Sequence, residues 1–236
     1  MTTPLTAIGL DADDTLWHND RFFRLTEERF IALLSDYAEP DHLAERLLDA
    51  ERRNIQRYGF GIKGFTLSMI ETALEVTENR VPGAVIAELV EAGQEMLSHP
   101  IELLPGALET VQDLSERFTI VLITKGDLID QERKLAQSGL GELFDGVEIV
   151  SDKTEDVYRG IFAGRGAEPG VVLMAGNSLK SDVNPVISVG GWGVHVPFGP
   201  VWALEAAEPP RDHPRFREIT ELGYLPATVS EICRNI

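Results

Sequence analysis

The chain has 236 residues, 43% of them hydrophobic and 25% charged, which is enough apolar material for one large domain or two modest ones. Its formal net charge of −18 repels nucleic acid and anionic membrane surfaces, so we expect neither as a partner. The single cysteine, Cys233, cannot form an internal disulfide, and no apolar run approaches the roughly 18 residues of a membrane span. The N-terminus has no basic flank followed by a long apolar segment. These features predict a soluble protein of the reducing cytoplasm.

The first predicted element is a buried strand over residues 5–10, because LTAIGL is apolar and has no helical period. Three aspartates follow it within four residues: Asp11, Asp13 and Asp14. Like charges this close repel each other and resist burial, so their presence needs a chemical reason. Residues 20–98 then carry apolar side chains at helical spacing, which predicts about four amphipathic helices and no strand.

After a connection at 99–106 that contains two prolines, helical and strand patterns alternate. Alternation of this kind indicates a parallel sheet whose strands are joined by right-handed helical crossovers. The tail from about residue 197 is predicted to contain a loop, a last strand and a short helix. The predicted strands cover 118–124, 146–150, 171–176 and 191–196, and the predicted helices lie near 107–117, 128–138, 154–165 and 179–189.

The first strand has no sheet partner until the helical block has passed. The simplest architecture is therefore an α/β fold with a Rossmann-like parallel-sheet core, formed by residues 1–18 and 100–236. An all-helical domain of residues 19–99 is inserted after the first strand. In open parallel sheets, ligands bind beyond the carboxyl ends of the strands, so that edge is the predicted site.

Polar residues follow four of the predicted strands at this edge. Asp11 and Asp13 follow the first strand, and Thr124 ends the second. Lys153 follows the third strand, and Asp182 follows the fourth. Neighbouring carboxylates repel one another unless a hard divalent cation lies between them, and oxygen ligands of this kind favour Mg²⁺. The sequence therefore predicts a magnesium site at this edge.

The motif DADDT, residues 11–15, resembles the Asp-x-Asp-x-Thr first motif of the haloacid dehalogenase-like hydrolases. IVLIT, ending at Thr124, is similar to their second motif, Lys153 to their third, and GNSLKSD, residues 176–182, to their fourth. The helical block lies where one subgroup, the phosphoglycolate phosphatase-like members, carries a helical cap between the first two motifs. All four motifs occur in order, and the resemblance extends to about residue 196.

The resemblance implies a role for each matched residue. Asp11 would be the nucleophile that forms an aspartyl-phosphate. Asp13 would protonate the leaving alcohol and later accept a proton from water. Mg²⁺ would be bound by the Asp11 side chain, the Asp13 main-chain carbonyl and Asp182. Thr124 and Lys153 would hold the phosphoryl oxygens.

One position departs from the common pattern, because Asn177 stands where many members have an aspartate. We expect this change to tune metal binding and not to abolish it. An anionic substrate also needs local positive charge in so acidic a chain, and lysine occurs only five times. Lys63 and Lys125 are the predicted substrate-binding lysines.

The segment GFGIKG, residues 59–64, contains Lys63 and formally matches the Gly-x-Gly-x-x-Gly pattern of dinucleotide-binding folds. That fingerprint requires a strand before it, whereas a long amphipathic helix precedes it here, so the interpretation as an oxidoreductase fails. We expect instead that Lys63 lies in a turn between two cap helices and contacts the non-phosphate end of the substrate. The alternative is a plain turn with a solvated lysine.

The predicted function is that of a Mg²⁺-dependent phosphatase acting on a small phosphorylated metabolite. Asp13 favours this over a 2-haloacid dehalogenase, because a halide leaves without a proton and an alkoxide does not. A phosphosugar mutase of the same superfamily is the main alternative, and a non-enzymatic phospho-receiver module is less favoured. The sequence leaves the individual substrate and the oligomeric state open.

Overall fold

A computed structural model describes residues 5–235 and divides them into two compact units. One unit contains the N-terminal strand through His18, Ile101–Lys125 and the chain from Gln131 onward. The other contains Asn19–Pro100 and also Gly126–Asp130. The sequence-based ranges had assigned this last segment to the α/β core, whereas the structure packs it with the helices.

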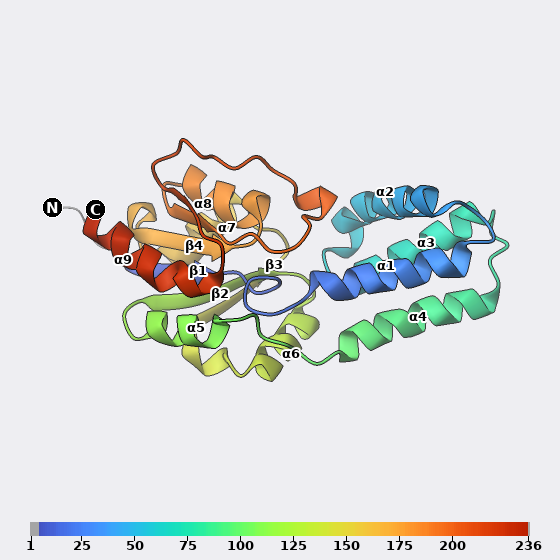
Figure 1. Cartoon of the computed structure of the whole chain (residues 1–236), viewed down its shortest axis with the longest axis horizontal. Coiled ribbons are helices and arrows are strands. Elements are labelled where there is room, and N and C mark those ends of the chain that lie inside the picture. The colour runs from blue at the N-terminus through green and yellow to red at the C-terminus, as the bar shows by residue number, and fades with distance from the viewer. Residues whose placement is uncertain (1–4, 236) are drawn as a thin grey trace. The chain divides into compact units, whose positions relative to one another are not determined.

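The α/β unit is built on one sheet of six parallel strands in the order β3-β2-β1-β4-β5-β6 (Figure 1). β1 lies at the centre because both β2 and β4 pair with it. The predicted strands and the predicted parallel topology are confirmed. The strands are β1 (Ala7–Leu10), β2 (Thr119–Lys125), β3 (Gly146–Val150), β4 (Val172–Gly176), β5 (Trp192–His195) and β6 (Phe216–Glu218).

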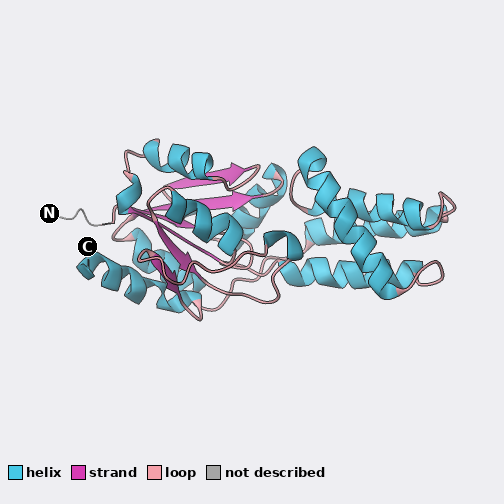
Figure 2. Ribbon diagram, turned by 90° about the horizontal axis from the view of Figure 1, so that it is seen from above, coloured by secondary structure: helices cyan, strands magenta, loops and turns pink. Residues whose placement is uncertain are grey.

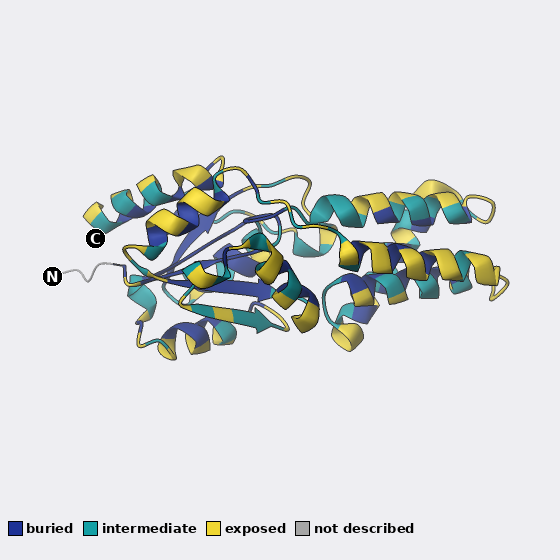
Figure 3. Cartoon of the chain, turned by 90° about the horizontal axis from the view of Figure 1, so that it is seen from below, coloured by how far each residue is buried: buried dark blue, intermediate teal, exposed yellow. Residues whose placement is uncertain are grey.

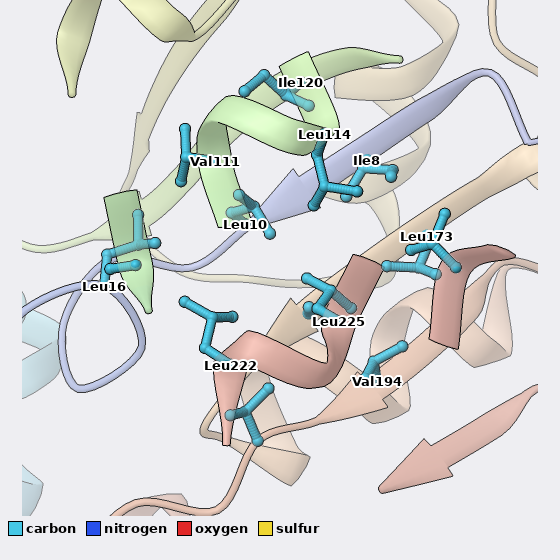
Figure 4. Packing of buried hydrophobic residues seen from close by; sticks show 14 of the residues in the cluster. Ile8, Leu10, Leu16, Val111, Leu114, Ile120, Leu173, Val194, Leu222 and Leu225 are labelled. Carbon is cyan, nitrogen blue, oxygen red and sulfur yellow. The ribbon is translucent and has the colours of Figure 1, made fainter. Parts of the chain in front are cut away.

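Helices cover both faces of this sheet (Figure 2). On one face, Ile8 and Leu10 of β1 pack with Val111 and Leu114 of α5 and with Leu225 of α9 (Figure 4). The opposite face packs against α7 and α8. The helices of this part of the chain are α5 (Ala107–Ser115), α6 (Leu128–Ser138), α7 (Glu155–Ala163), the short α8 (Asn184–Ser188) and α9 (Leu225–Asn235).

β1 is buried on both faces, and Gly9 shows how closely it is packed. A Cβ at Gly9 would lie 2.7 Å from the Met174 sulfur and 2.8 Å from Cδ1 of Ile123, both closer than real contacts allow. The absence of a side chain at Gly9 therefore leaves room for Met174 and Ile123, from the two neighbouring strands, to pack against β1. The sheet strands are mostly buried, whereas the surrounding helices are exposed on their outer sides (Figure 3).

The helical unit confirms the four predicted amphipathic helices, and its described residues contain no strand. Each helix places an apolar stripe in a common core that includes Phe30, Leu47, Met69 and Leu89. No helix among residues 5–235 is long and apolar enough to cross a membrane. The four helices are α1 (Asp20–Leu34), α2 (Pro40–Tyr58), α3 (Ile62–Val76) and α4 (Gly83–Ser98).

Candidate active site

The carboxyl ends of β1, β2 and β4 meet at one edge of the sheet, since β1 lies between the other two. Asp11 follows β1 directly, and Thr124 is buried near the end of β2. Lys153 comes three residues after β3, and Asp182 lies in the turn after β4. The topology thus gathers these four predicted site residues from segments that are far apart in sequence.

Lys153 connects two of the aspartates. Its Nζ lies 2.5 Å from Oδ1 of Asp11 and 2.7 Å from Oδ1 of Asp182. All three residues are almost completely buried, with exposed fractions of 4% for Lys153, 6% for Asp11 and 1% for Asp182. A single ammonium group therefore faces two carboxylates, which leaves one negative charge uncompensated in this triad.

The excess negative charge of the triad affects the pKa values of its members. Burial, followed by the Asp182 carboxylate, raises the pKa of Asp11 to about 7, although Lys153 opposes this shift. Burial alone would lower the pKa of Lys153, but the Asp11 and Asp182 carboxylates outweigh it and raise that pKa above its ordinary value. Lys153 is therefore charged. Further positive charge nearby would stabilise the ionised form of Asp11.

The turn after Asp11 is built to hold its second carboxylate oxygen. Thr15 Oγ1 donates to Asp11 Oδ2 at 2.9 Å, and the Asn177 amide donates to Thr15 Oγ1 at 3.1 Å. Asp14 has a φ of 59°, in the left-handed region that aspartate tolerates better than most residues. Asp14 is thus a turn residue. From the sequence, Thr15 is identified only as part of a motif. Its contact with Asn177, after the neighbouring strand, is visible only in the folded structure.

Gly176, at the end of β4, gives the two aspartates their space. A Cβ there would collide with the carboxylate of Asp182 and with Cβ of Asp11. After it, Leu179–Val183 forms a π-helical turn, a rare structure often found at functional sites. The amide of Ser178, the residue before this turn, donates to Asp182 Oδ2 at 2.9 Å, which fixes the carboxylate that faces Lys153.

Asp13 points to a different set of partners. Trp17 Nε1 donates to its Oδ1 at 2.7 Å, and Gln131 Nε2 donates to its Oδ2 at 2.8 Å. The buried Lys134 ammonium donates to both oxygens, at 2.9 and 3.1 Å. Gln131 and Lys134 were not predicted as site residues. They lie three residues apart on α6 and contact Asp13 from more than a hundred residues away in sequence. The rarity of lysine was the one available signal for Lys134.

The two lysines expected to bind substrate both have carboxylate partners within the chain. Lys125 Nζ donates to Ser181 Oγ at 2.7 Å and to Glu205 Oε1 at 2.5 Å. Lys63 Nζ, half-exposed within the helical unit, donates to Asp127 Oδ2 at 2.8 Å. Their roles toward substrate stay predictions.

Lys63 is also placed differently from the prediction. The turn after α2 is shorter than expected and has two glycines with positive φ, Gly59 at 76° and Gly61 at 113°. α3 begins at Ile62, so Lys63 lies in the first turn of a helix and not in the connection. Periodicity missed this because GFGIKG interrupts the apolar pattern on which a helix start is judged.

Asn177 contacts neighbouring residues through its main-chain amide and carbonyl groups. Its amide supports Thr15, and its carbonyl oxygen lies 3.2 Å from Nε2 of His195. His195 Nδ1 in turn lies 3.0 Å from Oε2 of Glu218 on β6. These contacts hold the start of the turn that carries Asp182. Whether the Asn177 side chain affects a metal stays a prediction.

The donor chemistry of this edge fits Mg²⁺. Among the described residues, no group of three or more His, Cys, Asp or Glu side chains is arranged to hold a metal. Asp11 and Asp182 nevertheless supply hard carboxylate oxygens and an uncompensated negative charge, which is the environment that Mg²⁺ prefers. The Asp13 carboxylate is turned toward Trp17, Gln131 and Lys134, so its side-chain oxygens already have partners within the chain.

Comparison with known proteins decides the family. The family model of the haloacid dehalogenase-like hydrolases matches residues 5–190. The chain belongs to this family. A solved structure of a haloacid dehalogenase-like hydrolase from Xanthomonas campestris is 40% identical, with a TM-score of 0.88, and the match covers 98% of this chain and 93% of that one. The chain is therefore a hydrolase of the haloacid dehalogenase-like superfamily.

More distant haloacid dehalogenase-like folds include members with different chemistry. A predicted phosphoglycolate phosphatase from Haemophilus somnus is 16% identical with a TM-score of 0.65, covering 97% of this chain and 99% of that one. The L-2-haloacid dehalogenase from Xanthobacter autotrophicus is 17% identical with a TM-score of 0.66, covering 96% and 98%. Both share the fold alone at this identity. No curated protein matches the chain in sequence.

Proposed function

We propose that this haloacid dehalogenase-like hydrolase is a Mg²⁺-dependent phosphatase of the cytoplasm that hydrolyses a small phosphorylated metabolite. The observation that carries the proposal is the pair of carboxylates two residues apart, each held by its own buried lysine. Lys153 binds Asp11, and Lys134 binds Asp13. This arrangement supports separate tasks for the two acids, namely attack on phosphorus and proton transfer.

In the first step, an Asp11 carboxylate oxygen attacks phosphorus and the bond to the ester oxygen breaks, giving an aspartyl-phosphate. Asp13, in its protonated form, gives its proton to the departing alkoxide, so the product leaves as an alcohol. Lys153 and Thr15 hold the nucleophile in place, and Lys153 also offsets charge that accumulates on the transferring group. Bound Mg²⁺ would supply electrostatic stabilisation of the phosphoryl oxygens.

In the second step, water attacks the aspartyl-phosphate and returns its proton to the chain. Asp13 accepts this proton as a carboxylate, and the phosphorus–Asp11 bond breaks to release inorganic phosphate. The structure supports the carboxylate form of Asp13, because Trp17, Gln131 and Lys134 all donate to it. The two steps together require Asp13 to give a proton in the first and to accept one in the second.

An assay of phosphate release against a panel of small phosphorylated metabolites, with and without Mg²⁺, tests the proposal. Asp11→Asn should lower kcat by about 10²-fold or more, because it removes the nucleophile. Asp156→Asn is the matched control, since Asp156 is strongly exposed on α7, and it should retain wild-type activity. Retention of more than about a tenth of the activity by Asp11→Asn would overturn the aspartyl-phosphate mechanism.

The same variants distinguish the alternatives. Halide release from 2-haloacids without phosphatase activity would identify a dehalogenase, which shares the nucleophile but needs no proton for its leaving group. Conversion of one sugar phosphate into an isomer without net phosphate release would identify a mutase. A phosphorylated Asp11 that forms but does not turn over would identify a receiver module.

A further inference from the structure

The segment after β5 contributes a buried acid to the candidate site, although the family match ends at residue 190. A short helical turn, Ala203–Glu205, places the Glu205 side chain among three donors. Its carboxylate accepts from Lys125 Nζ at 2.5 Å, from Ser178 Oγ at 2.6 Å and from Ser181 Oγ at 2.5 Å. Only 13% of the Glu205 side chain is exposed.

These three donors come from two different strand ends. Lys125 is the last residue of β2, directly after Thr124. Ser178 and Ser181 belong to the turn after β4 that carries Asp182. Glu205 therefore connects the end of β2 with this turn, and β1 with its nucleophile lies between those two strands in the sheet.

The hydrogen bonds continue from Glu205 to Asp182. Ser178 Oγ accepts from the Ser181 amide at 3.0 Å, and the Ser178 amide donates to Asp182 Oδ2 at 2.9 Å. The segment has a second attachment to the same turn, because Lys180 Nζ donates to the Leu204 carbonyl oxygen at 2.6 Å. The position of Asp182 thus depends on a turn that Glu205 holds from outside.

A carboxylate suits this position better than a neutral acceptor. Burial alone would raise the pKa of Glu205, but Lys125 and the two serine hydroxyls outweigh it and lower that pKa below its usual range. The group is therefore ionised near neutral pH. Hydrogen bonds to an ionised acceptor are roughly twice as strong as neutral ones, so the turn gains rigidity from the charge.

We propose that Glu205 is a positioning residue of the active site, which holds the Lys125 ammonium and the Ser178–Asp182 turn so that Asp182 faces Lys153 and Asp11. Its kinetic consequence rests on the proposed phosphatase function, whereas its structural consequence does not. The tail segment thereby becomes part of the catalytic unit, although it carries none of the four motifs.

The test compares Glu205→Gln with Glu208→Gln in the full chain. Both variants remove one negative charge from the same segment and keep the side-chain shape, but Glu208 is exposed. Amide hydrogen exchange of residues 177–183 should become about tenfold faster or more in Glu205→Gln, because the acceptor that orders the turn is weakened. Exchange in β1 should not change, and Glu208→Gln should resemble wild type throughout.

Kinetics give a second, separate readout. For a small aryl phosphate, Glu205→Gln should lower kcat by about tenfold and leave KM within about twofold, because the reacting groups lose alignment while little ground-state contact is lost. Lys125→Met should not add its full effect to that of Glu205→Gln, since both disturb one cluster. Glu205→Asp, which keeps the charge, should recover part of the lost kcat.

Unchanged exchange of residues 177–183 in Glu205→Gln, or equal effects of the two glutamine variants, would overturn the positioning role. If Glu205→Gln does not fold, the variant Ser181→Ala removes one donor to the same carboxylate, keeps the bond from the Ser181 amide to Ser178 Oγ, and should reproduce the faster exchange. Failure of the wild-type enzyme to release phosphate would count against the proposed function only. The exchange comparison would still decide the role of Glu205.

Discussion

The pair between Asp13 and Lys134 gives the sharpest quantitative test of the site, because a stability measurement needs no substrate. Lys134 has 6% of its side chain exposed and Asp13 has 21%, and the ammonium contacts both carboxylate oxygens at 2.9 and 3.1 Å. Removing either charge leaves the other in a largely dry environment. Lys134→Met and Asp13→Asn should therefore each destabilise the protein.

The magnitude follows from distance and burial. Opposite charges about 3 Å apart attract by roughly 5.5 kcal/mol at an effective dielectric constant of about 20, before desolvation is subtracted. Breaking a fully buried pair typically costs about 3–5 kcal/mol. Asp13 keeps its hydrogen bonds from Trp17 and Gln131 and some access to water. We therefore expect each single variant to lose about 2–3 kcal/mol and the double variant to lose little more.

Urea unfolding of the wild type, both single variants and the double variant measures the coupling free energy. We expect about 2 kcal/mol of coupling for Asp13 and Lys134, and less than about 0.5 kcal/mol for the exposed control pair Asp156 and Arg159. Additive losses in the Asp13–Lys134 cycle, or coupling no larger than in the control pair, would show that the two charges do not stabilise each other.

The remaining predictions use activity and acid stability. Asp13→Asn should slow hydrolysis of alkyl phosphates far more than that of aryl phosphates, whose leaving groups need little protonation, and equal slowing in a steady-state assay would exclude Asp13 as the general acid. Chelation by EDTA should remove activity and Mg²⁺ should restore it, while Asp182→Ala should raise the Mg²⁺ concentration that is needed. Because the pKa of Glu205 is lowered on folding, its stabilisation is present above the usual value of 4.5 and is lost as the pH falls through the lowered pKa. Urea midpoints measured from about pH 6 to about pH 3 should therefore fall less steeply for Glu205→Gln than for wild type.

Local patterns were sufficient for the strands, the four inserted helices and the matched motifs. A short apolar run between two helices, such as residues 171–176, is best explained as a buried strand. The motifs could be recognised because their residues are close together in sequence. Local patterns did not predict the side-chain contacts in and around the candidate site. Lys134 contacts the site from α6 and Glu205 from the short helical turn Ala203–Glu205, and tertiary packing over long sequence separations sets their pairing. No window of sequence contains that information.

The start of α3 and the position of Gly126–Asp130 also could not be predicted from local sequence patterns. Two glycines with positive φ end α2 and start α3 within a few residues, so the connection is much tighter than the polarity of the segment indicates. Gly126–Asp130 follows β2 directly in sequence but packs with the helical unit. Sequence adjacency therefore placed it with the wrong neighbours.

The distribution of lysine shows why the proposed site would need a further cation before it could hold an anion. Three of the chain's five lysines, Lys153, Lys134 and Lys125, face carboxylates of the site. They meet four carboxylates, which are Asp11, Asp182, Asp13 and Glu205. With all of these groups ionised, the cluster keeps one net negative charge, and a phosphoryl group with negative charge of its own would be repelled. Under the proposed function, a divalent cation would reverse the sign to one net positive charge, and this charge balance would favour binding of the substrate together with the metal and not before it.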